Sequence, residues 1–542
     1  MNQRDVQPEI VFYTNTNVDI SPFVQSIDIW RSKKNPVATA QIVLNPSIAN
    51  STCLTQSNVK IVDYWQTVLK KYNILSIKMD KKDKKHKFLG FITHIYPRVS
   101  ANNQNTSREL VINCGLLIST ALINDNLVMA SQLSNITDIK NDPVLGPRAE
   151  FFKFTRGYGK DGSPFVGKEP QVAVQYILEH MIATGTTVQQ GSGSNVTLQS
   201  FFPGTKQTDI DGKPMFDFNF LDYEQLYNPN LSTYTGTLLN YIYQCLDMAW
   251  YEAFFDTSTG TDGMPYNKFV IRSKPYSYKG VKSQYDLRKK WVYMDDLASY
   301  TVNSDQRIFE SLGTNILEYK NFWQVYYAMS LIAAPNTTAA TFGVNLPVIN
   351  IEGVKKYGLR DLVTTSTILN IEEVRKEYNV KQADSTGITM TYAAAQQSKL
   401  FESLLDKREK MIQWTCFPNF YSGQLTVIGG EYDLDKAIFY EDQIYTDPDT
   451  GQKYKGVAYL IDSITDSYRI GQMYTTTLGL VRGAPNGFMK DWLNKNRSKF
   501  ISIDTFEQRE LQPGLSYSVD IKDTRDRRAT TTANMLPITE VN

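Results

Sequence analysis

The sequence predicts a mainly β protein of the α+β class, with two similar β-barrel domains, an inserted α+β region and a C-terminal extension. The main support is a repeated layout, in which Phe88 to Cys114 and Tyr454 to Ala484 each read as strand, polar turn and strand. Each pair closes a β-rich region of comparable size, which favours two copies of one module. The composition agrees, because 33 Tyr and 26 Phe are typical of strands and interfaces.

The later hairpin shows the clearest strand pattern. Val457 to Ile464 is apolar at nearly every position, as expected for a strand covered on both faces. Tyr474 to Arg482 alternates between two faces, with Leu478 and Leu480 on one of them. The intervening turn ends at Gly471, which is free to adopt a positive φ.

The length of 542 residues predicts several domains, because a single hydrophobic core stops growing well below this size. We expect a first barrel over 1–130, which 285–330 could complete, an α+β insertion over 131–284, a linking segment and second barrel over 285–484, and a C-terminal helix and tail over 485–542.

Apolar stripes at helical spacing predict helices over Gln171–Ala183, Thr237–Trp250 and Tyr392–Trp414. In the last helix the pattern predicts two faces, an inward one with Leu400, Leu404, Met411 and Trp414, and an outward one with Lys407, Arg408 and Lys410.

Charge and cysteine content exclude several function classes. Lys plus Arg is 57 and Asp plus Glu is 56, so a net charge of +1 argues against a bulk nucleic-acid binder. The cysteines have no CxxC spacing, which predicts buried reduced thiols in place of a disulfide framework or zinc site: Cys53, Cys114, Cys245 and Cys416. Asp209, Asp211 and Gly212 are expected to form a turn, since the other ligands of a calcium loop do not follow. We therefore expect no metal site and no cofactor.

Two further patterns concern the surroundings of the protein. The N-terminus lacks an apolar signal region and no run approaches 18 apolar residues, so neither a secretion signal nor a membrane-spanning segment is expected. The densest charge run, Lys81 to Lys87, could be a phosphate-binding patch. We favour a solvated hairpin tip, because strands flank it and the region has no wider basic excess.

The order of elements resembles the baseplate hub proteins of contractile phage tails and related injection machines, including the late control protein D family. The resemblance spans roughly 20–483 and rests on short motifs in the family's order: Ile20–Ile27 leading to Ala38–Leu44, Tyr251–Asp256 followed by Phe269–Pro275, Tyr357–Arg360, Gly423–Gly429, and a final hairpin ending in Leu480–Gly483.

What this resemblance implies is mechanical. Such hubs carry two barrels similar to the tail-tube subunit, so a homotrimer presents six in a ring that adapts the sixfold tube to the threefold central spike. The expected partners are the tail tube or its initiator, the spike as a separate chain, and other baseplate subunits. DNA would pass through the lumen without sequence-specific binding, so lumen-facing side chains should be polar and not strongly basic. The protein would belong to a virion tail baseplate assembled in the host cytoplasm.

The C-terminal segment predicts a partner interface. Phe488 to Phe500 reads as a basic amphipathic helix, in which four apolar side chains could dock on the spike or on an adjacent subunit: Phe488, Trp492, Leu493 and Phe500. A loosely packed terminal helix is the alternative.

Two rival functions remain open. A tail-associated cell-wall hydrolase would need paired carboxylates, and the candidates are Glu252 with Asp256, Glu431 with Asp433 and Asp435, and Glu441 with Asp442. These residues lie beside turns or at strand ends, where solvated carboxylates are usual. The 3 His have no Ser, Cys or Asp partner at a recognisable spacing, so we expect no enzyme. A receptor- or carbohydrate-binding tail protein would also be rich in strands and aromatic residues.

Overall fold

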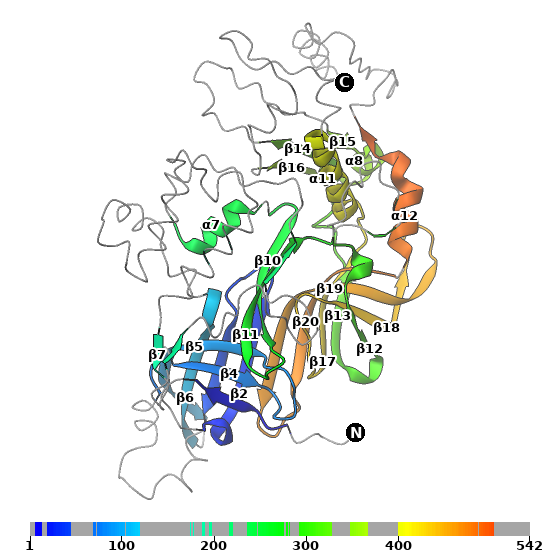
Figure 1. The fold of residues 1–542 in the computed structure, drawn as a ribbon. Helices are drawn as coiled ribbons and strands as arrows, with labels where there is room; N and C mark the ends of the chain where they lie inside the picture. Colours follow the sequence, from blue (N-terminus) through cyan, green and yellow to red (C-terminus); the bar gives the residue numbers. More distant parts are fainter. Residues whose placement is uncertain are drawn as a thin grey trace, which may run out of the picture.

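Two six-stranded halves form one continuous 12-stranded sheet, whose strands lie in the lower part of Figure 1. The structure is a computed structural model that describes residues 6–13, 19–44, 69–71, 73–102, 105–119, 174, 177, 187–189, 195–197, 216–219, 236–246, 248–275, 278–279, 281, 292–327, 347–366, 399–485 and 487–502.

The first half has the strand order β1-β4-β5-β6-β3-β2. Its strands are β1 (Glu9–Phe12), β2 (Val24–Ser32), β3 (Thr39–Leu44), β4 (Ile74–Lys78), β5 (Phe88–Asn102) and β6 (Asn105–Leu116). The second half contains β12 (Ser299–Val302), β13 (Arg307–Thr314), β17 (Tyr421–Ile428), β18 (Ala437–Thr446), β19 (Lys453–Arg469) and β20 (Thr475–Pro485). Its order is β18-β19-β20-β17-β13, and β12 pairs with the outer edge of β18.

Five strands of each half repeat one topology, whereas the sixth strands differ, since β1 pairs antiparallel with β4 and β12 pairs parallel with β18. The antiparallel order β4-β5-β6-β3-β2 in the first half matches β18-β19-β20-β17-β13 in the second, and the corresponding strands follow the same chain order. A short 3₁₀ helix precedes the first strand of each set, η1 (Ser21–Phe23) before β2 and η7 (Ser304–Gln306) before β13.

β-bulges occur at equivalent places in both halves. The β2–β3 register shifts between Val24 and Ser26, and the β13–β17 register shifts between Arg307 and Phe309. The hairpins behave alike, because β5 shifts after Ile92 and β19 after Ile461. Since a bulge is a specific local feature, its recurrence at matched positions supports the duplicated module that the sequence predicts.

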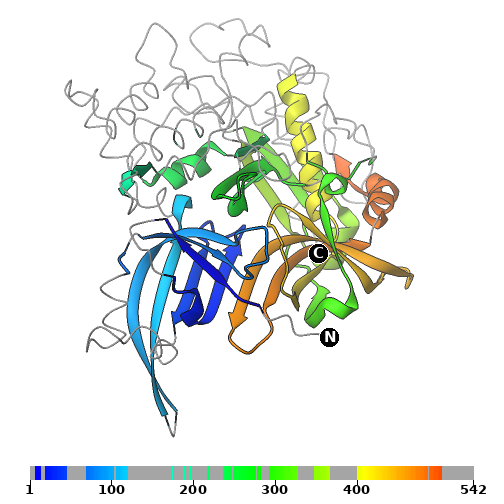
Figure 2. The same cartoon turned by 60° about the horizontal axis from the view of Figure 1, so that its bottom comes forward.

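The predicted C-terminal hairpin is present as β19 and β20, and each strand is longer than the sequence pattern indicated. Gly471 has a φ of 73°, as expected for its turn position. On one edge β19 pairs with β20. On its other edge it pairs with β18 in its first part and with β2 over Ser463–Arg469 in its last part. This single strand therefore joins the two halves, which Figure 2 shows as blue and orange strands in one surface.

Part of the segment between the halves covers the core side of this sheet. β10 (Tyr251–Thr259) and β11 (Pro265–Ser273) form a hairpin, and β9 (Phe216–Asn219) lies parallel to β11. β7 (Thr187–Gln189) pairs with β8 (Asn195–Thr197). All nine residues of β11 are buried. The hairpin reaches both halves, since the Asn267 amide donates to the Leu89 carbonyl (3.1 Å) and Arg272 donates to the Asp435 carbonyl (2.9 Å).

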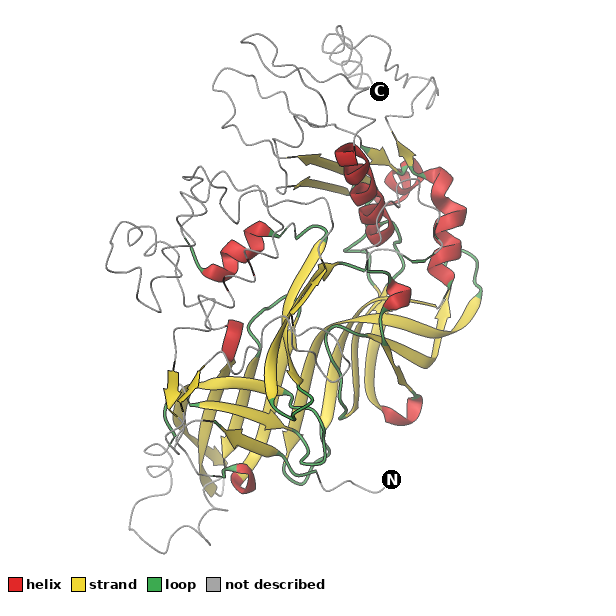
Figure 3. Ribbon diagram, in the orientation of Figure 1, coloured by secondary structure: helices red, strands yellow, loops and turns green. Residues whose placement is uncertain are grey.

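A separate helix-and-sheet layer lies beyond the second half (Figure 3). Its sheet has the order β16-β14-β15-β21, and its elements are β14 (Phe322–Tyr327), β15 (Val348–Ile349), α8 (Ile351–Tyr357), β16 (Asp361–Ser366), α11 (Lys399–Thr415), α12 (Phe488–Asn496) and β21 (Ile501–Ser502). This layer is not predicted as a unit by the sequence pattern, because its strands are short and far apart in the chain. Within the described residues, no helix combines the length and apolarity needed to span a bilayer.

Several sequence expectations are corrected by these elements. Residues 299–314 do not complete the first barrel, because β12 and β13 pair with β18 and β17 of the second half. The helix expected over Thr237–Trp250 is shorter, since α7 covers Leu238–Cys245 and the aromatic run that follows enters β10. The helix expected over Gln171–Ala183 lies almost wholly outside the described residues.

The outward face expected for the last long helix is also wrong. Lys407, Arg408 and Lys410 are each no more than 6% exposed. The ammonium groups lie over aromatic rings, with Lys407 Nζ 4.8 Å from the Trp250 ring centre and Lys410 Nζ 5.4 Å from that of Tyr293. Neighbouring elements therefore cover both sides of α11, and the long aliphatic stems pack where the pattern suggested solvent.

Candidate functional site

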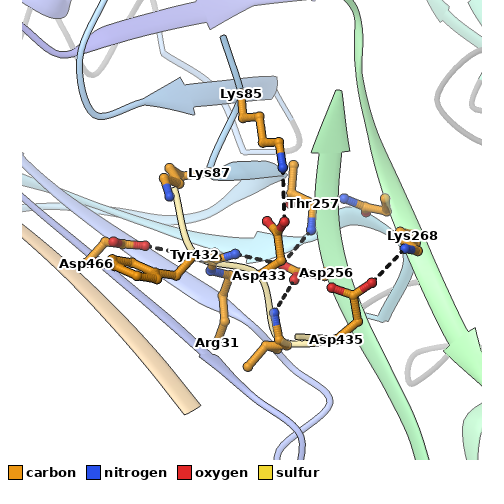
Figure 4. A network of polar contacts seen from close by, with 12 residues as sticks. Arg31, Lys85, Lys87, Asp256, Thr257, Lys268, Tyr432, Asp433, Asp435 and Asp466 are labelled. Carbon is orange, nitrogen blue, oxygen red and sulfur yellow. Dashed lines mark hydrogen bonds and ion pairs between the residues drawn. The ribbon is translucent and has the colours of Figure 1, made fainter. Parts of the chain in front are cut away.

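The most prominent feature of the interior is a buried ionic network where the two halves meet, drawn in Figure 4. At its centre is Arg31 on β2, which is 2% exposed. Its guanidinium lies 2.7 Å from Asp256 Oδ1 on β10 and 2.9 Å from Asp466 Oδ2 on β19, and it donates to the Tyr432 carbonyl at 3.2 Å. One side chain thus connects the first half, the inserted hairpin and the second half.

Asp466 is held in its charged form by its surroundings. Burial alone would raise the pKa of this carboxyl, but Lys87, Arg31 and hydrogen bonds lower it below the usual range. The hydroxyls of Tyr474 and Thr476 donate to Asp466 Oδ1 at 2.8 and 2.7 Å. For Asp256 burial prevails and raises the pKa. The network therefore contains two buried carboxylates around one guanidinium, each with a different proton affinity.

Further ion pairs surround this centre. Lys85 Nζ lies 3.0 Å from Asp433 Oδ2, Lys268 Nζ 3.1 Å from Asp435 Oδ2, and Arg272 Nε 2.7 Å from Glu252 Oε1. Lys85 and Lys87 contact the 430–435 loop of the second half, since Lys87 Nζ donates to the Gly430 carbonyl at 2.6 Å. Breaking a buried pair costs far more than breaking an exposed one. The Lys85 and Lys87 contacts therefore help to fix how the halves meet, and the Lys268 contact holds the inserted hairpin against the second half.

The carboxylates that the sequence offers as hydrolase candidates mostly belong to this network. Glu252, Asp256, Asp433 and Asp435 are ion-paired inside the protein, so the expectation that they are solvated is wrong. Glu431 accepts backbone N–H groups of Lys84 and Lys85 at 3.1 and 3.3 Å. Glu441 and Asp442 are exposed on β18, as expected. Across the described ranges, no group of three or more His, Cys, Asp or Glu residues has the arrangement needed to hold a metal ion.

The lysine-rich run between β4 and β5 divides into two parts. Lys81, Lys82 and Lys84 are exposed, as predicted for a solvated hairpin tip. His86 and Lys87 are 5% and 2% exposed, so the end of the run belongs to the junction. The sequence does not predict this burial, because a run of lysines looks the same whether its side chains face solvent or a buried acidic loop.

The opposite face of the long sheet is open and has a different chemistry. Over β3, β2, β19, β20 and β17 its side chains are mainly neutral and polar, and include Thr39, Gln41, Ser463, Thr465, Ser467, Thr475, Thr477, Gln424 and Thr426. Trp30 on β2 is an exposed aromatic side chain on the same face. We call this surface the polar face. Its charged side chains in the central strands form a pair, since Arg469 Nη2 lies 2.7 Å from Asp28 Oδ2.

The polar face repeats between the halves. Gln41 on β3 and Gln424 on β17 occupy equivalent positions, being opposite Asp28 and Ser311 in the matched strand pairs. Each half also bridges strands with uncharged groups, because the Gln41 amide donates to Asn113 Oδ1 at 3.1 Å, and the hydroxyls of Thr426 and Thr477 are 3.0 Å apart. A hydroxyl- and amide-rich surface therefore continues across both modules.

The C-terminal residues predicted as a partner interface contact the protein's own core. Phe488 and Leu493 are buried, while Trp492 and Phe500 are half-buried. Ring centres lie 5.7 Å apart for Phe417 and Phe488, and 5.0 Å apart for Phe417 and Trp492, and Phe500 lies 5.8 Å from Trp323. Phe488, Trp492 and Phe500 also line one side of a groove of about 560 Å³ between α12, α8 and the β18–β19 turn.

Sequence reasoning missed Arg31 and Asp466, although a signal exists. Both are charged residues at core-facing positions of strands with an alternating pattern. Arg31 follows the buried Ile29 by two residues on β2, and Asp466 lies between the buried Ile464 and Tyr468 on β19. A charge at such a position indicates a buried partner. Cys114 and Cys416 are free and buried as predicted, whereas Cys53 and the side chain of Cys245 lie outside the described part.

Comparison with solved structures finds several distantly similar proteins. A 43 kDa tail protein of prophage MuSo2 from Shewanella oneidensis is 10% identical, with a TM-score of 0.41 and coverage of 88% of this chain and 98% of that chain. A tail protein from Neisseria meningitidis MC58 is 9% identical, with a TM-score of 0.38 and coverage of 89% and 98%. An Escherichia coli component of the type VI secretion system, described as structurally similar to T4 bacteriophage tail proteins, is 8% identical, with a TM-score of 0.34 and coverage of 89% and 78%.

The first two of these neighbours are described as tail proteins and the third as a secretion-system component. No family model matches the chain, and no curated protein does.

Proposed function

We propose that this chain is a structural hub of a phage-tail baseplate or related contractile machine. Three copies would form a ring of six similar modules around a channel, with the sixfold tail tube on one side and a separate threefold spike on the other. The observation that carries the proposal is the duplicated module whose two copies share one sheet. A chain with two equivalent modules is the simplest way to present sixfold surroundings with threefold symmetry.

The polar face is the surface that would line the channel. The core side of the sheet is covered by β10, β11 and the 430–435 loop, so the open side is the one that DNA could contact. DNA binds strongly to arrays of Lys and Arg because such contacts release counterions. A surface of Thr, Ser and Gln with one internal ion pair lacks that attraction, which suits a strand that must slide through.

The hydrolase alternative gains no support from its candidate acids. Four of them are neutralised by buried cations at 2.7–3.1 Å, so in this conformation they do not face an open cleft. We therefore propose that the role is not enzymatic, and a peptidoglycan zymogram of the purified protein is the direct check. A cleared band from the intact chain would contradict the proposal.

Partner docking through α12 stays part of the proposal in a modified form. Because Phe488 and Leu493 pack inward, the helix would present its exposed side, including Lys490 and Lys495, and the rim of the adjacent groove. The double change Lys490→Glu with Lys495→Glu should weaken capture of a spike or neighbouring baseplate subunit and leave the fold intact. Unchanged capture would contradict docking at this site.

Native mass spectrometry of the purified chain tests the hub proposal. The expected species is a homotrimer that persists at low micromolar concentration. A stable monomer with measurable affinity for a sugar or receptor would favour a receptor-binding tail protein instead.

A further inference from the structure

We infer that neighbouring copies join by pairing β13 of one chain with the outer part of β5 of the next, in the same register by which β2 pairs with β19 inside the chain. This inference rests on the proposed trimeric hub and specifies the strands that would close it. It comes from the internal duplication, because the edges of β13 and β5 that correspond to the β2–β19 junction are unpaired among the described strands.

The first unpaired edge belongs to β13. This strand ends the path of the long sheet and pairs with β17 alone among the described strands. Residues 307–311 are all exposed, and Ile308 and Phe309 are 48% and 55% exposed. β13 is eight residues long, is solvent-exposed, carries exposed apolar side chains and contains no Pro or Lys. A strand edge of this kind can pair with a strand of another chain.

The second unpaired edge belongs to β5. Among the described strands, this edge of β5 pairs with β4 alone and only over Phe88–Phe91, whereas β5 continues along β6 to Asn102. In the second half, the equivalent stretch of β19 is the part that receives β2, over Ser463–Arg469. Aligning the two bulges places Ile95 at the position of Ile464 and Tyr96 at that of Thr465.

The same alignment defines the register between chains. β13 corresponds to β2, with Phe309 at the position of Ser26 and Gly313 at that of Trp30. Since Trp30 lies opposite Thr465, Gly313 should lie opposite Tyr96 of the next copy. Within the chain the large Trp30 of β2 lies opposite the small Thr465 of β19. Between chains the small residue, Gly313, would be on β13 and the large one, Tyr96, on β5.

Local space agrees with this pairing. A Cβ added at Gly313 would meet nothing within 4 Å, and Tyr96 is 40% exposed. An aromatic ring opposite a glycine in a neighbouring strand shields glycine backbone that would otherwise be exposed to solvent. Pro97, at the position of Asp466, would remove one N–H from the intermolecular ladder, and a proline on an open edge also limits pairing in wrong registers.

The contact would be head-to-tail, since β13 and β5 are different surfaces of the same chain. Such contacts close into a ring when the rotation per copy divides a full turn. With the internal β2–β19 junction alternating with the β13–β5 junction, each module would meet its neighbours in one way around the ring. The occupant of the β13 edge is thus a second copy of this chain.

Disulfide trapping tests the register. In the β2–β19 pair, the backbone bonds Lys33 N to Asp462 O and Ile470 N to Gln25 O mark every second opposed pair as hydrogen-bonded, which leaves Thr465 and Trp30 as a non-hydrogen-bonded pair. Cα atoms in such a pair are about 4.5 Å apart, within disulfide range. The full chain with Tyr96→Cys and Gly313→Cys should therefore form inter-chain disulfides up to trimers under mild oxidation, which peptide mass spectrometry would locate.

A matched pair, Tyr96→Cys with Thr314→Cys, slips the register by one residue and puts the thiols on opposite faces, so trapping should fall about tenfold or more. The wild-type chain and each single variant measure background.

The outcomes separate the two proposals. A wild-type trimer in native mass spectrometry, with trapping no better than in the slipped pair, would overturn the β13–β5 pairing and leave the hub intact. A wild-type monomer would contradict the hub and this pairing with it.

Discussion

Arg31 Nη2 and Asp466 Oδ2 lie 2.9 Å apart across the junction between the two halves of the long sheet, and both side chains are almost fully buried. Their strands are adjacent, so this contact sits directly behind the polar face. The alignment of the polar face across the two modules therefore depends on the buried Arg31–Asp466 ion pair, to which solvent has no access.

Removing one charge of this pair should destabilise the chain strongly. Asp466→Asn leaves Arg31 and Lys87 with excess positive charge in the interior, and the expected loss in unfolding free energy is about 3–5 kcal/mol. Urea denaturation followed by tryptophan fluorescence measures it. Asp462→Asn, which removes an ion pair with the exposed Lys34, is the matched control and should cost less than about 1 kcal/mol. Equal effects would contradict a special role for the junction.

His86 should make stability depend on pH. Burial, followed by nearby Lys78, lowers its pKa from 6.5 to about 4. Between these values the unfolded chain binds a proton that the folded chain does not, so this contribution is complete above pH 6.5 and is lost as pH falls toward 4. The effect is at most about 3 kcal/mol. His86→Gln should flatten unfolding free energy against pH in this window, and an unchanged slope would count against the assignment.

The two ends of the lysine run should respond differently to the same change. Lys85→Met removes the partner of Asp433, whose pKa is held below its usual range by Lys85 and Lys87 against the opposing effect of burial. A depressed carboxyl pKa gives stability that is present above the unfolded pKa and lost at lower pH, so this variant should lose about 1–3 kcal/mol at neutral pH. Lys82→Met, at an exposed position, should change stability by less than about 0.5 kcal/mol. Indistinguishable melting curves would show that Lys85 is not part of the junction.

Basic side chains on the polar face should hinder DNA passage without preventing assembly. Gln41→Lys with Gln424→Lys places one cation on each module, so a trimer would present six phosphate contacts to a passing duplex. Particles carrying the change should assemble normally and deliver DNA more slowly, with the defect relieved by added salt. Thr261→Lys, in the exposed turn between β10 and β11, is the charge-matched control. Normal DNA delivery by the double variant would contradict the proposal that the polar face lines the channel.

The sequence predicted the parts of the fold that depend on local pattern. The β19–β20 hairpin was recognisable because apolar and alternating strands flank a glycine turn, and the echo in β5 and β6 revealed the duplication. The β2–β19 junction could not be predicted, because it joins residues more than 400 positions apart and depends on tertiary pairing. The burial of the α11 lysines and of Asp433 was not predicted for a related reason. A charged pattern in the sequence suggests a solvent-exposed face, but tertiary packing covers these side chains.

Electron microscopy of the purified chain tests the central claim most directly. Class averages should show rings with threefold symmetry, six similar lobes and an open central channel. Particles that are monomeric, or rings without a channel, would contradict the assignment of this chain as a baseplate hub.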